Sequence, residues 1–586
     1  LVKGTTIGTV TNPDGNFSLA VPGNDVLSFS FIGMKTVEVQ ITDNNFYNVT
    51  MQYAVIGVDE VMVVAYGTAK KESFTGSAEV INNATLEKRP VANISKAIEG
   101  QVAGVQATSG SGQPGEGATI VIRGFGSINS SNNPLYVVDG VPFDGDLNSI
   151  NPGDIESMTI LKDASAGALY GSRGANGVVV ITTKKGKSEK LTVEFKASYG
   201  LSGRAIKPYK TLNTADFIEA SFQGYKNDLI YNGGVHPDLA GEMAVEAMKG
   251  STGIFGANEI YNPYNMPVSE LIDPLTGRVN PSAKLLYETD WMDEITRKDA
   301  TRQEYQFFVN GGSENAKIYT SIAYLKDEGL LKTTDFERIS GRMGADLSPK
   351  AWLTFGGNVN FSKTNSNFLG YENSTSNSNV WYSAQYMAPI YPVYVLDEQG
   401  NPVLSETGEK QFDYGRTRPA GANPNWNPVA TLYNDAYETT ADNLSGRFHL
   451  DLLGKGVHQS VDGLSVSVNV GFDYVNTNQT TYWNPDFGNA ATVGGMLDLV
   501  NNRNFSYTMN ELVRYDKDFG SHSFNILAGH EFYKLVINEM QGQKTGFPYA
   551  GIKVLAPGST TSLLTSFEDN YAIESFLTNL TYDFDD

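Results

Sequence analysis

Apolar and polar residues alternate one by one over two long stretches of the chain. In LTVEFKASY (191–199) and LSVSVNVGFDY (464–474), every second residue is apolar or aromatic and most of the others are polar. Side chains of a strand point alternately to its two faces, so this period of two predicts strands with one apolar face. Eight further segments are candidate strands, which makes ten: 302–310, 316–325, 336–347, 352–361, 443–453, 505–516, 523–533 and 575–584.

The connections between these strands alternate in length. The short ones are 311–315, 348–351 and 517–522, the intermediate ones 326–335 and 454–463, and the long ones 200–301, 362–442, 475–504 and 534–574. A soluble β-sandwich also shows a period of two, but a membrane barrel has short turns at one rim and longer loops at the other. The alternation therefore favours a transmembrane antiparallel β-barrel. Ten strands leave open edges that lipid does not tolerate, so we expect closing strands beyond this chain.

The first 190 residues have a different character. Residues 4–53 contain short candidate strands (5–10, 16–21, 26–32 and 36–41) and the turn sequence Asn-Pro-Asp-Gly, which predicts an incomplete β-sandwich. Residues 74–186 mix short strands with a short helix at 94–99, which predicts a compact α/β module. Within it, Gly110–Gly115 matches GxGxxG but leads into the β-like ATIVIRG instead of a helix, so it does not predict a dinucleotide site.

Two charged residues end apolar strands of this module. Arg123 follows VI and Asp139 follows VV, so we expect each to be buried and to need a partner. A catalytic role would require a second acid, a nucleophile or a metal ligand nearby, and the sequence indicates none. A structural ion pair or an interface contact is the favoured interpretation.

A short acidic and apolar segment, Asp59-Glu60-Val61-Met62-Val63-Val64, lies between the two modules. An extended apolar strand outside a domain can pair with the sheet edge of another protein. It can equally be the last strand of the preceding sandwich. The residues alone leave these two interpretations open.

Composition narrows the function classes. The formal charge is -22, which disfavours nucleic acid as a partner, because phosphate backbones are held by clustered Lys and Arg. The chain has no cysteine and only five histidines, which excludes disulfides and thiolate zinc sites. A soluble polysaccharide-acting enzyme would need a pair of carboxylates at a fixed separation, and no motif indicates one.

The order of elements resembles the SusC-like (SusC/RagA) family of TonB-dependent outer-membrane transporters. The end of a carboxypeptidase-regulatory-like domain, a TonB box, and the two halves of a plug signature carry this resemblance: KGTT to DGNF (3–17), VDEVMVVAYGT (58–68), IRG to SIN with PLYVVDGVP (122–142), and LKDASA to LYGSRGANG with ITTK (161–184). The likeness is specific up to about residue 186 and rests on pattern afterwards.

The resemblance implies a mainly β fold. We expect an incomplete regulatory-like β-sandwich (1–53), the TonB box with its linker (54–73), an α/β plug (74–187), and the first part of a membrane barrel (188–586) with about ten of about 22 strands. The chain would be a fragment truncated at both ends. The family resemblance places the barrel in the bacterial outer membrane, with the N-terminal domain and TonB box in the periplasm.

The resemblance also implies a mechanism and its partners. Cargo binding would shift the plug and release Asp59 to Val64, with which TonB, energised by ExbB and ExbD, would pair by β-addition. A SusD-like surface lipoprotein would act as a lid, and the cargo would be a glycan or a peptide. No catalytic residue, cofactor or metal is expected. A receptor or adhesin without energised uptake is the alternative.

Candidate site residues follow from the same resemblance. In the plug they are Arg123, Asp139, Gly140 and Arg173, as structural or gating groups. Substrate contacts are expected from the long connection after residue 373, whose aromatic residues include Trp381, Tyr382, Tyr386 and Trp426. Aromatic faces stack on sugar rings. Packing of the loops, or an interfacial aromatic girdle, is the alternative and is favoured.

Overall fold

The computed structural model divides the chain into two compact units, residues 1–63 with 67–75, and residues 64–66 with 76–586. It describes the chain except residues 1, 4, 6, 13–14, 22–24, 32–33, 35, 43–44, 52–60, 65–66, 71–76, 164–167, 188–189, 208, 369–378, 420, 459–460 and 585–586. The first unit contains β1 (Val26–Phe29) and β2 (Val37–Gln40), paired antiparallel from Val26 opposite Gln40 to Phe29 opposite Val37.

The first unit contains fewer regular strands than the β-sandwich predicted from the sequence. Residues 7–10 and 16–21 form no strand, although both segments were expected to. Phe17 nevertheless packs edge-on against Phe29 of β1, with ring centroids 5.2 Å apart. The segment Val61–Val64 forms strand β3, which pairs with β4 (Gly67–Lys70) in a separate two-stranded sheet.

The plug is an α/β module built on a five-stranded sheet in the order β5-β10-β11-β8-β9. A separate hairpin joins β6 to β7, and short helices complete the module. The bounds are β5 Ala78–Asn82, α1 Asn83–Leu86, α2 Ile94–Ala97, β6 Val105–Thr108, β7 Thr119–Ile122, β8 Leu135–Val138, β9 Val141–Pro142, η1 Leu147–Ser149, η2 Pro152–Asp154, β10 Ile155–Leu161, η3 Ala168–Gly174 and β11 Val178–Thr183.

The plug core explains why these short strands form. Apolar side chains of β10 and β11 are fully buried with α2, as shown by Ile94, Met158, Ile160, Val179 and Ile181, which are all 0% exposed. The GxGxxG segment connects the antiparallel strands β6 and β7 with no helix between them. Its rejection as a dinucleotide fingerprint is therefore confirmed.

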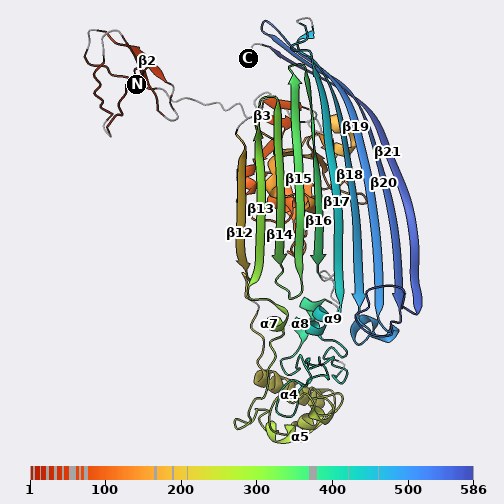
Figure 1. Cartoon of the computed structure of the whole chain (residues 1–586). Helices are drawn as coiled ribbons and strands as arrows, with labels where there is room; N and C mark the ends of the chain where they lie inside the picture. Colours follow the sequence, from red (N-terminus) through yellow and green to blue (C-terminus); the bar gives the residue numbers. More distant parts are fainter. Residues whose placement is uncertain are drawn as a thin grey trace. The chain divides into compact units, whose positions relative to one another are not determined.

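Ten antiparallel strands form one sheet, which we call the wall, and each pairs with the next in sequence (Figure 1). The bounds are β12 Thr192–Ser202, β13 Ala300–Gly312, β14 Ala316–Glu328, β15 Asp335–Lys350, β16 Leu353–Asn367, β17 Ala436–Leu453, β18 Leu464–Trp483, β19 Met496–Phe519, β20 His522–Thr545 and β21 Thr560–Phe584. This sequential order is that of an up-and-down barrel wall, and the predicted ten strands are confirmed.

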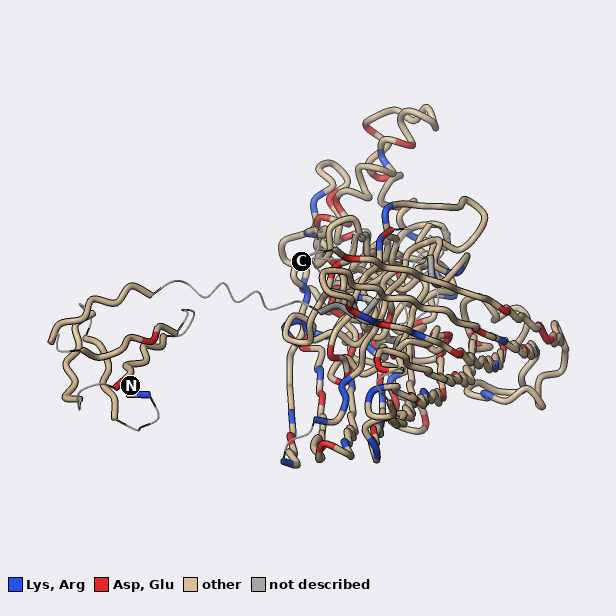
Figure 2. The backbone as a smooth tube through the Cα atoms, turned by 90° about the horizontal axis from the view of Figure 1, so that it is seen from above, with Lys and Arg blue, Asp and Glu red and all other residues tan. Residues whose placement is uncertain are grey.

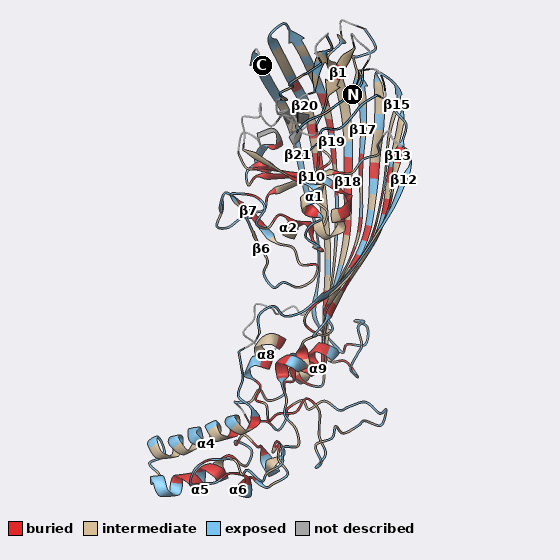
Figure 3. Cartoon of the chain, turned by 90° about the vertical axis from the view of Figure 1, so that its left-hand side faces the viewer, coloured by how far each residue is buried: buried red, intermediate tan, exposed pale blue. Residues whose placement is uncertain are grey.

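The two faces of the wall differ as the period of two predicts. On β14 and β15 the outward side chains Ile322 and Met343 are 60% and 66% exposed, whereas the inward Ser321 and Arg338 are 1% exposed. The apolar stripe therefore faces outward, and the polar stripe faces the plug, which lies against the inner face of the wall (Figure 3). Acidic and basic residues are interspersed along the strands (Figure 2).

The two rims of the wall differ in the connections they carry. Turns such as 313–315, 351–352 and 520–521 join strands at the short-turn rim. The opposite, long-loop rim carries helices α4 Thr214–Tyr231, α5 Pro237–Ala247, α6 Val268–Leu271, α7 Trp291–Ile295, α8 Val380–Tyr386 and α9 Pro428–Asn434. No helix within the described residues is long and apolar enough to cross a membrane.

Candidate functional site: the plug interface and the loop module

Arg338 of β15 joins the wall to the plug backbone. Its side chain is buried, and Nη1 donates to the carbonyl oxygens of Ala92 at 2.9 Å, Asn148 at 3.1 Å and Ile150 at 3.3 Å. Backbone carbonyls in these plug loops have no strand partner there, and a guanidinium offers several donors in a fixed fork. Arg338 therefore anchors plug loops whose backbone carbonyls are not paired in a β-sheet.

Asp139 occupies a tight turn and forms the second contact between the plug and the wall. Asp139 and Gly140 have φ values of 49° and 85° and join β8 to β9. Two residues with positive φ favour Asp-Gly in such a hairpin turn. This turn directs the Asp139 carboxylate at the wall, where Arg342 lies 3.3 Å and Asn358 Nδ2 lies 3.1 Å from Oδ2.

The pKa of Asp139 reflects this environment. Burial alone would raise the pKa of this carboxyl, but Arg342 and the two hydrogen bonds from Thr183 outweigh burial and hold the pKa below its usual value. Thr183 donates from its backbone N at 2.9 Å and from Oγ1 at 2.6 Å. Asp139 is thus a charged, fully satisfied anchor at the plug surface.

A third contact lies farther around the wall. Arg173 of the plug pairs with Glu531 of β20 and lies 4.6 Å from the ring centroid of Tyr533. Tyr533 in turn donates to Asp144 Oδ2 of the plug at 2.9 Å. Glu531 and Tyr533 are both 3% exposed, so these contacts are shielded from solvent.

Arg123 departs from its prediction. Its side chain is 51% exposed instead of buried, and its partner is Asp163 within the plug, not a wall residue. The ion pair is present, yet Arg123 is not at the wall interface. Its φ of 58° and that of Gly124, 102°, turn the chain out of β7 and direct the guanidinium to the surface.

The arginines of the wall were not among the site residues predicted from the sequence. Arg338, Arg342 and Arg447 occupy the inward, polar stripe of β15 and β17, where most side chains are small or neutral. An arginine on the inward stripe of a strand needs a hydrogen-bond acceptor on the module that it faces. The sequence already shows these arginines on that stripe, so it indicated such an acceptor. Arg447 pairs with Asp473 of β18 at 2.9 Å, and Asp473 accepts from the backbone N of Asp144 at 3.3 Å.

A polar cavity of about 230 Å³ lies between plug and wall. Its lining combines Asp139 and Lys184 of the plug with Arg342, Arg447 and His449 of the wall. Among the described residues, no group of His, Asp and Glu is arranged to hold a metal ion. The cavity therefore offers room and mixed charge at the interface without a built metal centre.

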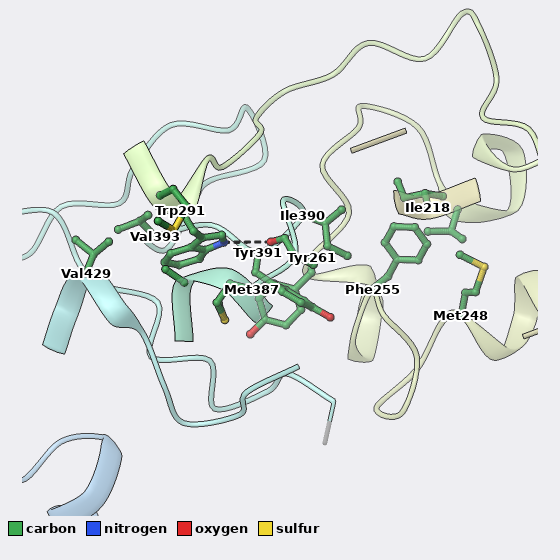
Figure 4. Close-up of a cluster of buried hydrophobic side chains, with 14 of the residues drawn as sticks. Ile218, Met248, Phe255, Tyr261, Trp291, Met387, Ile390, Tyr391, Val393 and Val429 are labelled. Carbon is green, nitrogen blue, oxygen red and sulfur yellow. Dashed lines mark hydrogen bonds between the residues drawn. The ribbon is translucent and has the colours of Figure 1, made fainter. Parts of the chain in front are cut away.

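The long-loop rim carries a folded unit, which we call the loop module (described residues of 203–299, 329–334 and 379–435). Its buried core combines side chains from three connections, including Phe222, Trp291, Leu331, Tyr391 and Val429 (Figure 4). Trp291 Nε1 donates to the Ala388 carbonyl at 3.1 Å. Two insertions that are far apart in sequence therefore fold together.

Helix caps and one arginine set the geometry of the loop module. Asp290 accepts from the backbone N of Met292 and Asp293 at the start of α7, and Asn427 caps α9, where Pro428 occupies the first turn. Arg297 Nη1 donates to the carbonyls of Gly329, Leu331 and Thr334 at 2.6–3.0 Å. These bonds tie the loop module to the β14–β15 connection.

The predicted aromatic residues occupy different positions in the loop module. Trp426 is 6% exposed and packs over Gly488, whereas Tyr386 is 66% exposed. Tyr382 and Tyr386 lie one turn apart on α8 with ring centroids 4.6 Å apart. Trp381 packs partly against the loop module core, with the guanidinium of Arg204 5.6 Å from its ring centroid.

The segment predicted as the TonB box, Asp59 to Val64, is only partly described. Asp59 and Glu60 lie outside the described residues, while the backbone of Val61 to Val64 is strand β3. Its partner is β4, so it is neither an edge strand of the β1–β2 sheet nor unpaired.

Comparison with known proteins defines the class to which this arrangement belongs. Residues 70–178 match the model of the TonB-dependent receptor plug domain, and residues 1–63 match that of the CarboxypepD_reg-like domain. A strand wall with such a plug against its inner face is the fold of a TonB-dependent outer-membrane receptor.

Individual curated proteins show which TonB-dependent receptors the chain is similar to. The chain is 30% identical to TonB-dependent receptor SusC of Bacteroides thetaiotaomicron over 92% of this chain and 49% of that relative. It is also 30% identical to TonB-dependent receptor P3 of Formosa agariphila, over 91% of this chain and 46% of that protein. The chain thus spans about half the length of these curated relatives.

Solved structures agree with these relatives. The RagAB peptide transporter matches with a TM-score of 0.68 and 26% identity over 88% of this chain and 54% of that chain. The RagAB peptide importer in its open-open state matches with a TM-score of 0.70 and 26% identity over 90% of this chain and 55% of that one. The matched residues are those of a SusC/RagA-like TonB-dependent receptor with its plug and CarboxypepD_reg-like domain.

Arg173 and Glu531 provide a test of the plug interface. Replacing Arg173 by Met leaves Glu531 buried without its charge partner, and breaking a buried pair costs about 3–5 kcal/mol. Because the chain has no cysteine, a single Val141→Cys reporter at the interface measures plug opening by its rate of thiol labelling. We expect the rate to rise about a hundred-fold in Arg173→Met and much less in the double variant with Glu531→Gln. Equal rates in both variants would contradict this contact.

Proposed function

We propose that this protein imports oligosaccharides or peptides across the bacterial outer membrane, gated by the plug and driven by TonB. The observation that carries the proposal is that side-chain contacts hold the plug against the wall, since no described strand of the plug pairs with a wall strand. Such contacts are separable, because each depends on a few groups such as Arg338, Asp139 and Glu531. A plug of this kind can be displaced while the wall keeps its hydrogen-bonded sheet.

The rims give the orientation we propose. Outer-membrane barrels have short periplasmic turns and longer extracellular loops, so the short-turn rim would face the periplasm and the loop module the outside. The N-terminal domain and the TonB box would then be periplasmic. The domain boundaries that we propose are 1–53, 54–73, 74–187 and 188–586, as derived from the sequence.

The partners we propose follow from the family. TonB, with ExbB and ExbD, would pair with the segment Asp59 to Val64, and a SusD-like lipoprotein would cover the loop module as a lid. The similarity to the RagAB peptide transporter supports peptide cargo, and glycan cargo is the expectation from the SusC-like sequence resemblance. Among the candidate contacts, Tyr386 of α8 is exposed, with the half-buried Tyr382 and Trp381 on the same helix.

Uptake by cells tests the proposal. We expect a labelled cargo pool to accumulate in cells that carry this protein, and accumulation to fall to background when TonB is deleted or a protonophore is added. Surface binding of the pool is expected to remain in both cases. Binding without any TonB-dependent accumulation would instead identify a receptor or adhesin and would reject energised import.

A further inference from the structure

One part of the loop module also reaches the plug: the connection between β14 and β15 (residues 329–334), which we call the link. Arg297 holds the link by its side-chain bonds to link carbonyls and by its backbone N, which donates to the Leu330 carbonyl at 2.7 Å. Leu331 of the link is 3% exposed and lies in the core of the loop module. The link is therefore firmly joined to the rest of the loop module.

The link is a closed turn. Its first residue, Gly329, donates from its backbone N to the carbonyl of its last residue, Thr334, at 3.0 Å. Thr334 Oγ1 donates to the Leu331 carbonyl at 2.9 Å, and Thr334 is 1% exposed. Buried, hydrogen-bonded backbone resists local opening, so the link transmits a displacement of one end to the other.

The plug meets the link with residues 110–117 between β6 and β7, which we call the glycine loop. A Cβ placed on Gly329 of the link would lie 3.3 Å from Pro114 Cδ of the glycine loop. A Cβ placed on Gly115 would overlap the ring of Phe336, which follows the link at the start of β15 and is 1% exposed. The glycine loop therefore packs on the link and on Phe336 without free space between them.

We propose that the link couples the loop module to the glycine loop of the plug, so that a conformational change in either one alters the stability of the other. Leu331 and Phe336 lie close together on one short segment, the first in the core of the loop module and the second in a buried cluster with Ala92 of the plug. Packed interfaces shift between discrete arrangements and do not deform continuously. In the import function proposed above, on which this role rests, cargo captured at the loop module would act on the plug through the link.

Two glycine variants test the coupling from the plug side without any cargo. Gly115 and Gly112 have φ values of 76° and 75°, but a Cβ on Gly112 would have no neighbour within 4 Å. Both changes to alanine therefore introduce similar backbone strain, and only Gly115→Ala presses on Phe336. The measurement is protease cleavage within the loop module of the full-length protein in isolated outer membranes. We expect Gly115→Ala to accelerate cleavage about ten-fold, a typical size for coupling between two sites, and Gly112→Ala to leave it near the wild-type rate.

Two arginine variants test the coupling from the loop module side, because a coupling free energy acts equally in both directions. The chain has no cysteine, so Gln113→Cys in the glycine loop reports its opening by the rate of thiol labelling. Arg297→Met removes bonds to the link alone, and we expect it to accelerate labelling about ten-fold. Arg278→Met is the matched control, because Arg278 is exposed and pairs with Glu219 of the loop module at 2.7 Å. It should leave the labelling rate unchanged.

The outcomes separate this inference from the import function. Equal rates within either matched pair of variants overturn the coupling, and the arginine pair decides alone where Gly115→Ala does not reach the membrane. Neither measurement uses cargo, so a protein that shows both effects but no TonB-dependent accumulation would keep the coupling and reject import. TonB-dependent accumulation with equal rates in the matched variants would keep import and reject the coupling.

Discussion

Replacing Val63 by proline should reduce cargo accumulation to the level of cells without TonB. Val63 lies in β3, whose backbone is already in strand conformation and paired with β4. Proline has no backbone N–H and is excluded from the interior of a strand ladder, so it would prevent pairing with TonB in place of β4. The measurement is accumulation of a labelled cargo pool per cell, with the amount of protein at the surface determined in parallel.

Val63→Thr is the matched control for this variant. Threonine keeps the N–H group and favours strands as valine does, so accumulation should stay near the wild-type level. Cargo binding at the cell surface should be the same in all three proteins, because β3 belongs to the periplasmic segment in the proposed orientation. Normal accumulation in the proline variant would remove this strand from the energy-coupling mechanism.

Replacing Arg418 by Met should open the loop module. The Arg418 side chain is fully buried, pairs with Asp413 at 2.8 Å and donates to the Trp426 carbonyl at 2.7 Å. Its guanidinium also lies 5.3 Å from the ring centroid of Tyr391. Methionine fills part of the volume but leaves the largely buried Asp413 carboxylate without its charge partner, which costs up to about 3–5 kcal/mol. Local unfolding should then increase about a hundred-fold or more.

Protease cleavage on intact cells measures this opening. Cleavage within the loop module should accelerate in Arg418→Met, while the wall strands remain resistant. Arg416→Met is the control: Arg416 is exposed and donates to the Asp486 carbonyl at 2.9 Å, so its loss should have little effect. Similar cleavage rates in the two variants would show that the loop module does not depend on the buried guanidinium.

The strands were predictable where one face is apolar and the other polar. Strands β14 and β18 begin at Ala316 and Leu464, where they were predicted to begin. The prediction failed where both faces are polar. Strand β19 begins at Met496, nine residues before the predicted start at 505, because residues such as Asn501 and Asn502 interrupt the apolar stripe.

The helices of the long connections were not predicted, for a related reason. Helix α4 buries only Thr214, Ile218 and Phe222 fully. It packs against α5 of the same connection, and the core that they join also contains Tyr391, about 170 residues away. The loop module becomes evident only when the wall places the two insertions at the same rim.

The sequence by itself determined the outward apolar stripe, the count of wall strands and the family motifs, because each depends on residues close together in the chain. The tertiary structure alone decided the partners of the buried charges. Arg338 meets carbonyls about 190 and 246 residues earlier, and Arg173 meets Glu531 358 residues later. Burial makes such a partner necessary, but only the seating of the plug against the wall determines which group provides it.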